Sequence, residues 1–134
     1  MEPWAHAWSL YDMANISEHF TAEERRCKCG KCDGAVIENL ELIRLLESVR
    51  HQVGNAIVIN SWCRCPAHNE AEGGKPDSAH LSGKAVDISC DNGVYRWKLV
   101  DILKSVGFQR IGIAKSFVHA DIDTEKPQRV IWTY

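Results

Sequence analysis

The strongest constraint on the fold is the alternation of two segments of helical periodicity with five short β-branched runs. In residues 36–53 apolar side chains recur every three or four positions, and Gly54 follows as a stop signal. Residues 94–107 show the same pattern and end in a glycine. We expect the inward-facing side chains to be Val36, Ile37, Leu40, Ile43, Leu46, Val49 and Val53 in the first helix, and Val94, Trp97, Val100, Leu103 and Val106 in the second.

The β-branched runs predict strands at residues 56–62, 84–89, 110–114, 116–122 and 129–134. The segment 65–82 is rich in Pro, Gly, Asn, Asp and Ser, which predicts a loop. Helices and strands in this order indicate an α+β fold with a mostly antiparallel sheet and flanking helices. We expect the Cys-rich N-terminal third to wrap around the outside, and Trp62 and Trp97 to be buried.

Length and charge limit the number of domains and the classes of partner. A chain of 134 residues is long enough for one core and too short for two, so residues 1–134 form a single domain. A net charge of -2 gives no general attraction to nucleic acid or to an anionic membrane, and no apolar run approaches the length of a membrane span. We therefore expect no nucleic-acid or membrane partner, and a monomer.

The N-terminal sequence MEPWAHAWSLYD lacks a basic segment followed by an apolar one, so it does not have the pattern of a signal peptide. We expect a chain that is made without its own export signal, or one whose leader has been removed.

Three residues suggest a metal site. His80 lies at the end of the predicted loop, and Asp87 lies in the strand that follows. Residues seven apart on one strand point to opposite faces, but a bend at Gly83 would let both reach one point. His119 lies on a later strand that can pair with the strand of Asp87. Two His and one Asp with a water as fourth ligand are typical of catalytic zinc.

The stretch SWCRCPAHNEAEGGKPDSAHLSGKAVDIS, followed by VHAD, resembles the zinc D-alanyl-D-alanine carboxypeptidase and murein endopeptidase family. This family belongs to a larger group that includes lysostaphin-type enzymes and the hedgehog domain. The resemblance covers residues 57–123, and SEHFTAEERRCKCG is similar to the start of phage-encoded, endolysin-type members. The matching positions are Ser61, Arg64, Pro66, Asn69, Gly73, Gly74, Ser78, His80, Gly83, Ala85, Asp87, Val118, His119 and Asp121.

The resemblance implies His80, Asp87 and His119 as zinc ligands. It also implies that Arg64 faces the scissile carbonyl or a substrate carboxylate, which suits a permanently charged guanidinium. Asn69 and Ser78 belong to the implied substrate-binding segment, although Ser78 can equally hold the loop of His80.

The general base departs from the family pattern. Many members place an acid three residues before the last His ligand, where this chain has Ser116. Asp121 is the best substitute, either as general base or as a carboxylate that orients a His ligand. Asp123 and Asp77 are weaker candidates.

The six cysteines raise a separate question. Cys27, Cys29 and Cys32 are spaced like the ligands of a second, structural zinc, for which His19, Cys63, Cys65 or Cys90 would supply the fourth ligand. The alternative is that reduced cysteines pack as small hydrophobic side chains. His68, nearby in the predicted loop, is expected to face solvent.

Three functions compete. The leading one is a zinc peptidase that cuts peptidoglycan stem peptides or cross-links, as carboxypeptidase or endopeptidase. The second is a zinc-dependent binding domain of the same fold without catalysis, an idea that Ser116 keeps open. The third, a nucleic-acid-binding zinc knuckle, conflicts with the net negative charge. A phage lysin of this kind waits in the host cytoplasm until a holin opens the membrane; otherwise we expect a cytoplasmic protein, or a periplasmic one with its leader removed.

Overall fold

The structure is a computed structural model that describes residues 15–30, 32 and 36–134. The N-terminal residues on which the signal-peptide expectation rests lie outside this range. In chain order the elements are α2 (Ala22–Arg25), α3 (Leu40–Val53), β1 (Ile59–Ser61), α4 (Pro66–Ala71), β2 (Ala85–Ser89), α5 (Gly93–Val106), β3 (Arg110–Ile113), β4 (Phe117–Asp121) and β5 (Val130–Thr133).

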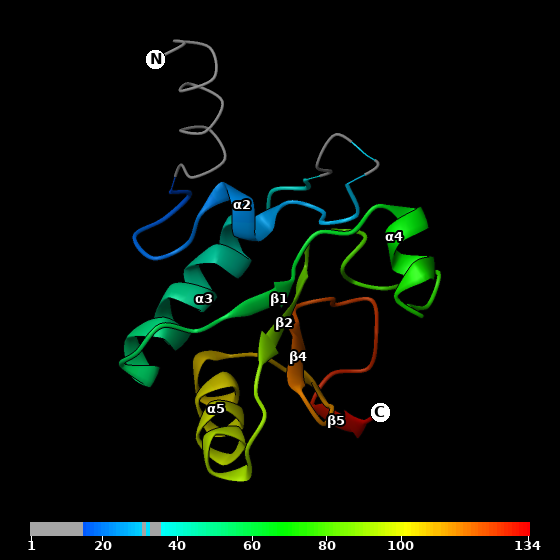
Figure 1. Cartoon of the computed structure of the whole chain (residues 1–134). Helices are drawn as coiled ribbons and strands as arrows, with labels where there is room; N and C mark the ends of the chain where they lie inside the picture. Colours follow the sequence, from blue (N-terminus) through cyan, green and yellow to red (C-terminus); the bar gives the residue numbers. More distant parts are fainter. Residues whose placement is uncertain (1–14, 31, 33–35) are drawn as a thin grey trace, which may run out of the picture.

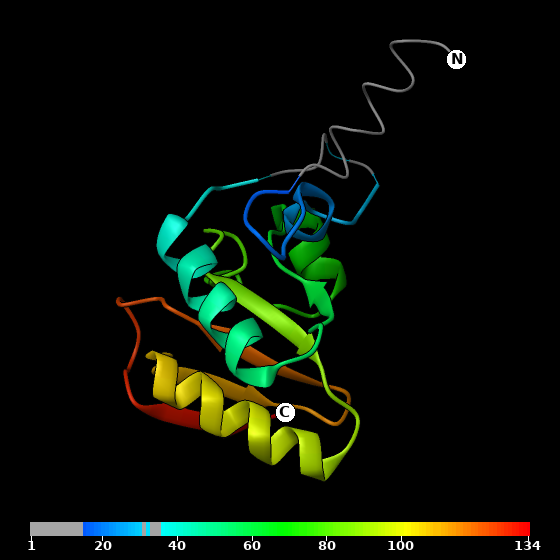
Figure 2. The same cartoon turned by 90° about the vertical axis from the view of Figure 1, so that its left-hand side faces the viewer.

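The five strands form one sheet in the order β1-β2-β4-β3-β5. Every neighbouring pair is antiparallel except β3 and β5, which run parallel. Helices α3 and α5 lie side by side over one face of this sheet (Figure 2). The predicted α+β fold with a mostly antiparallel sheet is confirmed, and all five predicted strands are present.

Helix α3 begins later than the sequence pattern suggested. The side chain of Asn39 accepts a hydrogen bond from the N–H of Leu42, which caps the helix at this point. Residues Val36 and Ile37 therefore precede the helix and are exposed, as is Leu40 in its first turn. The buried face consists of Leu42, Ile43, Leu45, Leu46, Val49 and Val53.

The predicted inner face of α5 is wrong in part: Leu103 is buried and Val100 and Val106 pack against the core as expected, but Val94 and Trp97 do not. Val94 and Trp97 are 85% and 81% exposed, whereas the buried side chains are Leu99, Ile102 and Leu103. At about 100° per residue, Val94 and Leu103 lie on opposite sides of a helix, so they cannot share one buried face. Contact with α3 decides which side is covered. Trp62, by contrast, is buried as expected, at 1% exposure.

The segment predicted as a loop contains a short helix, α4. Cys65 caps it through its sulfur, which accepts a hydrogen bond from the N–H of His68, and Pro66 occupies the first turn. Pro66 and Asn69, which suggested a loop, thus lie at the start and in the interior of this helix.

The N-terminal segment packs on the outside of α3 and β1 (Figure 1). Phe20 meets Trp62 edge to face at a centroid distance of 6.0 Å. The backbone N–H of His19 donates to Glu47 of α3 at 2.8 Å, and that of Cys63 donates to the carbonyl of Arg25 at 3.1 Å. These contacts confirm the predicted N-terminal wrap.

Successive side chains of β2 and β4 point to opposite faces of the sheet, so that one set enters the hydrophobic core and the other does not. Val86 and Ile88 of β2, with Val118 and Ala120 of β4, belong to the hydrophobic core under the helices. The intervening residues therefore point to the opposite face of the sheet. None of the helices in the described ranges is both long enough and apolar enough to cross a bilayer.

A substitution at Gly83 tests the bend before β2. Gly83 has φ +70°, and an added Cβ would lie 2.3 Å from the carbonyl oxygen of Ile37. We expect Gly83→Ala to lower the free energy of unfolding by about 2 kcal/mol or more, as measured by urea denaturation.

Gly54→Ala is the matched control. Gly54 has φ +81° but no atom within 4 Å of an added Cβ, so only the backbone strain of about 1 kcal/mol applies. Equal losses for the two variants would show that the contact with Ile37 is not a real constraint.

Candidate active site

The site starts from the pairing of β2 with β4. The antiparallel register places Asp87 directly opposite His119, and Ala85 opposite Asp121. Both members of the first pair project from the sheet face that the helices leave uncovered. The predicted meeting of these two strands is therefore confirmed.

His80 reaches the same point from the preceding turn. Its Nδ1 lies 2.7 Å from the carbonyl oxygen of Trp62, which can only accept, so Nδ1 carries the hydrogen. Its Nε2 lies 3.2 Å from Oδ1 of Asp87. The turn that aims the ring is held by the N–H of His80, which donates to the Ser78 hydroxyl, and by the left-handed Gly83.

His119 is oriented in the opposite sense. Its Nε2 lies 2.7 Å from Oδ2 of Asp121, a carboxylate that accepts the ring N–H, and its Nδ1 lies 3.0 Å from Oδ1 of Asp87. Each histidine thus turns one nitrogen toward Asp87 while another acceptor fixes the opposite nitrogen, an arrangement typical of metal-ligating histidines.

The three side chains fit a zinc ion. Their ligand atoms lie within 4.8 Å of one another, and all three residues are buried. A tetrahedral zinc with bonds of about 2.0–2.1 Å requires edges of about 3.4 Å between ligand atoms. The observed distances of 3.2 and 3.0 Å from Asp87 Oδ1 to the two rings are close to that value. Both distances are slightly shorter than that edge, so a bound ion would push these atoms slightly apart.

The charges favour a cation at this point. Burial opposes ionisation of Asp87, but hydrogen bonds with His119 and His80 outweigh it and hold the carboxyl pKa well below its usual range. Burial likewise opposes the charged form of His119, yet bonds to Asp121 and Asp87 raise the pKa of the ring. Asp87 and His119 thus favour positive charge between them, which a metal ion would supply in place of a proton.

Arg64 binds the second oxygen of Asp87. Its Nη2 donates to Asp87 Oδ2 at 2.9 Å and its Nε donates to the hydroxyl of Ser61 at 2.9 Å. Nη1 lies 3.4 Å from the side-chain oxygen of Asn69. A guanidinium has five N–H donors, so these contacts use three of them.

Asn69 occupies a different place from the one that its motif suggested. It is 2% exposed, and its amide nitrogen donates to the carbonyl of Lys75 at 2.7 Å. An added Cβ on Gly74 would lie 2.0 Å from its side-chain oxygen, so the glycine lets the loop close over it. Asn69 is therefore a buried partner that holds the guanidinium of Arg64 in place.

Asp121 has partners on both oxygens. Oδ2 binds His119, while Oδ1 accepts from Nε of Arg110 at 2.9 Å and from the N–H of Asp123 at 3.1 Å. Burial opposes ionisation, but the bond to His119 and the other donors lower the pKa of this carboxyl. Asp121 is therefore a buried carboxylate whose geometry matches an orienting role for His119.

A cleft of about 590 Å³ opens above these residues. Its lining includes Arg64, Asp77, Ser78, His80, Asp87, Arg110, His119, Asp121, Lys126, Trp132 and Tyr134. Ser78 is thus at the cleft as well as on the turn of His80. Ser116, three positions before His119, is exposed and precedes β4.

The sequence did not identify the roles of Arg110 and Trp132. Arg110 faces Asp121 across the β3–β4 pair, and its guanidinium lies 5.0 Å from the ring centroid of Trp132. The Trp132 ring also lies 5.4 Å from that of His119. The one available signal was Gly112 inside a β-branched run, where an added Cβ would lie 2.7 Å from the Trp132 ring.

A second cluster lies in the N-terminal wrap. The three predicted thiols, Cys27, Cys29 and Cys32, are joined by Cys65 at the start of α4. His68 was expected to face solvent, but its side chain is only 12% exposed and its Nδ1 lies 3.2 Å from the Cys27 sulfur.

Comparison with known proteins agrees with the geometry. The family profile described as peptidase M15 matches residues 18–123, more than half of the chain. No curated protein matches the chain. The match spans His80, Asp87 and His119 as well as the cysteine cluster. The chain therefore belongs to the peptidase M15 family, the family of zinc D-alanyl-D-alanine carboxypeptidases.

Proposed function

We propose that this protein hydrolyses the stem peptides or cross-links of peptidoglycan next to D-amino acids. Membership of the M15 family supports a zinc metallopeptidase that acts on peptidoglycan. The observation that carries the proposal is the convergence of His80, Asp87 and His119 on the floor of an open cleft. Among the residues that the structure describes, three candidate protein ligands converge there, as in catalytic zinc sites, where a water or the substrate completes the shell.

His80 and His119 would hold the ion through Nε2 and Nδ1, and Asp87 through Oδ1. The bound zinc supplies a Lewis acid that polarises the scissile carbonyl and acidifies a water molecule. The carbonyl of Trp62 and the carboxylate of Asp121 keep the two rings in the tautomers that this requires.

Arg64 has a position from which it would act on the substrate. It lines the cleft, and Asp87, Ser61 and Asn69 fix its guanidinium in place. Its two remaining N–H groups would donate to the oxygen on which negative charge develops, or to a peptide carboxylate. A donor held in advance needs no reorganisation when the charge appears.

Asp121 would act as a positioning residue. Its two oxygens already accept from His119, from Arg110 and from the N–H of Asp123, and the residue is 2% exposed, so its carboxylate offers little surface to a water in the cleft. Proton transfer would then fall to a carboxylate with solvent access. Asp77, on the loop before His80, lines the cleft and has a side chain that is 73% exposed.

The substrate class suits the charges of the cleft. Lys126 and Arg64 lie on its lining, and stem peptides carry carboxylates that such cations would bind. Trp132 and Tyr134 add aromatic surface beside the site. An endolysin-type setting and release through a holin stay predictions from the sequence.

The second candidate is a zinc-dependent binding domain that does not cleave. The observation that favours it is Ser116, which stands where many members have an acid. Both candidates require the same zinc ligands, so metal content cannot separate them, whereas product formation can.

Replacing one ligand tests the leading proposal. We expect His119→Ala to lose one zinc ion per chain relative to the wild type and to reduce murein cleavage by more than about 10³-fold. Metal is measured by plasma mass spectrometry, and cleavage by new amines and by mass spectrometry of released muropeptides.

His51→Ala, on the exposed side of α3, is the matched control and should keep both properties. A wild-type protein that binds zinc and murein but generates no new amine, and so releases neither peptide nor amino acid, would exclude the peptidase and favour the binding domain.

The variant Asp121→Asn separates positioning from proton transfer. If Asp121 orients His119, zinc affinity falls by about 10–100-fold and saturating zinc restores most of the kcat. Zinc titration combined with kinetics at saturating metal measures both effects. Asp101→Asn, at an exposed position of α5, is the control. Unchanged zinc affinity with a fall in kcat of about 10²-fold or more would instead make Asp121 the general base.

A further inference from the structure

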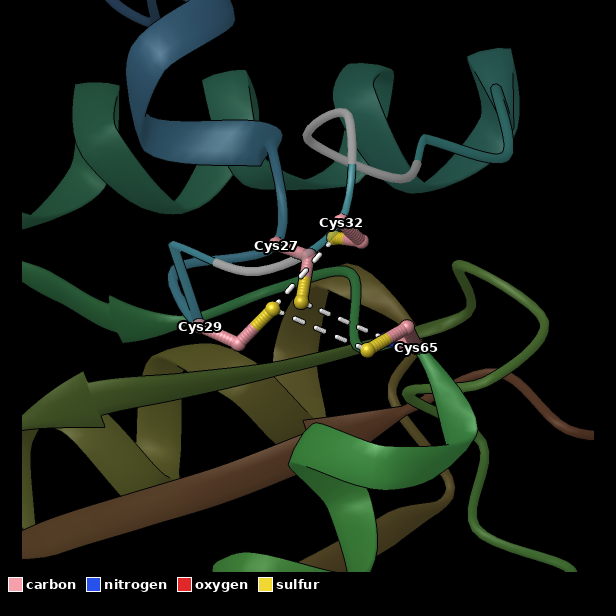
Figure 3. Close-up of side chains that lie close together, drawn as sticks. All are labelled: Cys27, Cys29, Cys32 and Cys65. Atoms are coloured by element: carbon pink, nitrogen blue, oxygen red, sulfur yellow. Dashed lines mark hydrogen bonds between the residues drawn. The ribbon is translucent and has the colours of Figure 1, made fainter.

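Four cysteine sulfurs converge where the N-terminal segment meets the start of α4 (Figure 3). Cys27, Cys29 and Cys32 follow α2 in the chain, and Cys65 is the residue that caps α4. Their sulfurs all lie within 4.8 Å of one another. The chain brings residues more than 30 positions apart to one point, away from the three ligands described above.

The spacing of the sulfurs matches a tetrahedral metal site. With zinc–sulfur bonds of about 2.3 Å, the edges of the tetrahedron measure about 3.8 Å. The sulfur of Cys29 lies 3.4 Å from that of Cys32 and 3.8 Å from that of Cys65. A disulfide requires about 2.05 Å, so sulfurs at these separations are not joined by one.

Backbone N–H groups point at two of the sulfurs. The N–H of Cys65 donates to Cys27 at 3.3 Å, and the N–H of His68 donates to Cys65 at 3.4 Å. Such bonds stabilise sulfurs that carry negative charge, as thiolate ligands do. The His68 ring, 3.2 Å from the Cys27 sulfur, lies beside the cluster and is tied to Glu72 by its Nε2.

The other candidates for a fourth ligand are engaged elsewhere. The ring of His19 binds Glu47, the thiol of Cys63 points at the carbonyl of Ile37, and that of Cys90 points at the carbonyl of Asn92. Cys65 is therefore the fourth member. A cavity of about 420 Å³ lined by Cys29, Cys32 and Cys65 gives an ion access to the cluster.

We propose that Cys27, Cys29, Cys32 and Cys65 bind a second zinc ion, whose role is structural. Four protein thiolates complete the coordination shell and leave no position for water or substrate, unlike the site in the cleft. The ion would tie the segment that carries Cys27, Cys29 and Cys32 to α4, and Cys65 is next to Arg64 in the chain. It thereby fixes the wall of the cleft that carries this arginine.

The test uses the His119→Ala protein, which removes the cleft ion and leaves the thiol cluster intact. We expect one zinc per chain in this variant by plasma mass spectrometry, released by a thiol-blocking mercurial and detected with a metallochromic dye. Cobalt exchanged into the same protein should give the strong sulfur-to-metal charge-transfer bands of a tetrathiolate site. Neither readout requires enzymatic activity.

Variants assign the ligands. In the His119→Ala background, Cys65→Ser should bind no zinc, whereas Cys63→Ala, at a buried cysteine two positions away, should keep it. A chelator should lower the melting temperature of His119→Ala, since metal bound only to the folded state stabilises it.

Three results would overturn the proposal. One is an absence of metal in reduced His119→Ala protein, which does not depend on the folding of any cysteine variant. Another is iron in place of zinc. The third is a non-reduced intact mass that shows disulfides among the four cysteines. None of these results bears on cleavage by the wild type, so the peptidase proposal stands or falls separately.

Discussion

The site depends on one interaction, the antiparallel pairing of β2 with β4. This register sets Asp87 opposite His119 and leaves both on the face of the sheet that α3 and α5 do not cover. A shift of one residue in either strand would send these side chains into the hydrophobic core and bring Val86 or Val118 out. Burial of the apolar side chains of β2 and β4 thus fixes the positions of Asp87 and His119, which alternate with them.

Around Asp87 and His119, the polar side chains form a network of hydrogen bonds and ion pairs. Asp87 takes both histidines on one oxygen and Arg64 on the other, while Asp121 joins His119 to Arg110. Such a network is rigid because every buried member has partners, and loss of one leaves others unpaired. Such rigidity would suit a metal site, whose ligands must be held close to the productive geometry.

The N-terminal segment contributes to the same site through residues that hold His80 and Arg64. Phe20 packs on Trp62, and the carbonyl of Trp62 fixes the ring of His80. The cysteine cluster joins this segment to α4, which carries Asn69 and thus the support of Arg64. Residues that precede residues 57–123 in the sequence therefore support both His80 and Arg64, through Trp62 and through α4.

The sequence by itself determined the fold class, the five strands and the choice of His80, Asp87 and His119 as candidate metal ligands. Hydrophobic periodicity reflects which side of a helix or strand is buried. His80, Asp87 and His119 lie within the residues that match the family. Only the tertiary structure decided the rest. The covered face of α5 follows from its contact with α3, because its apolar residues lie on more than one side. The partners of Asp121 and Arg64 depend on register and loop closure between distant segments. The same holds for the convergence of Cys65 with the three N-terminal cysteines. No local pattern in the chain encodes these distances.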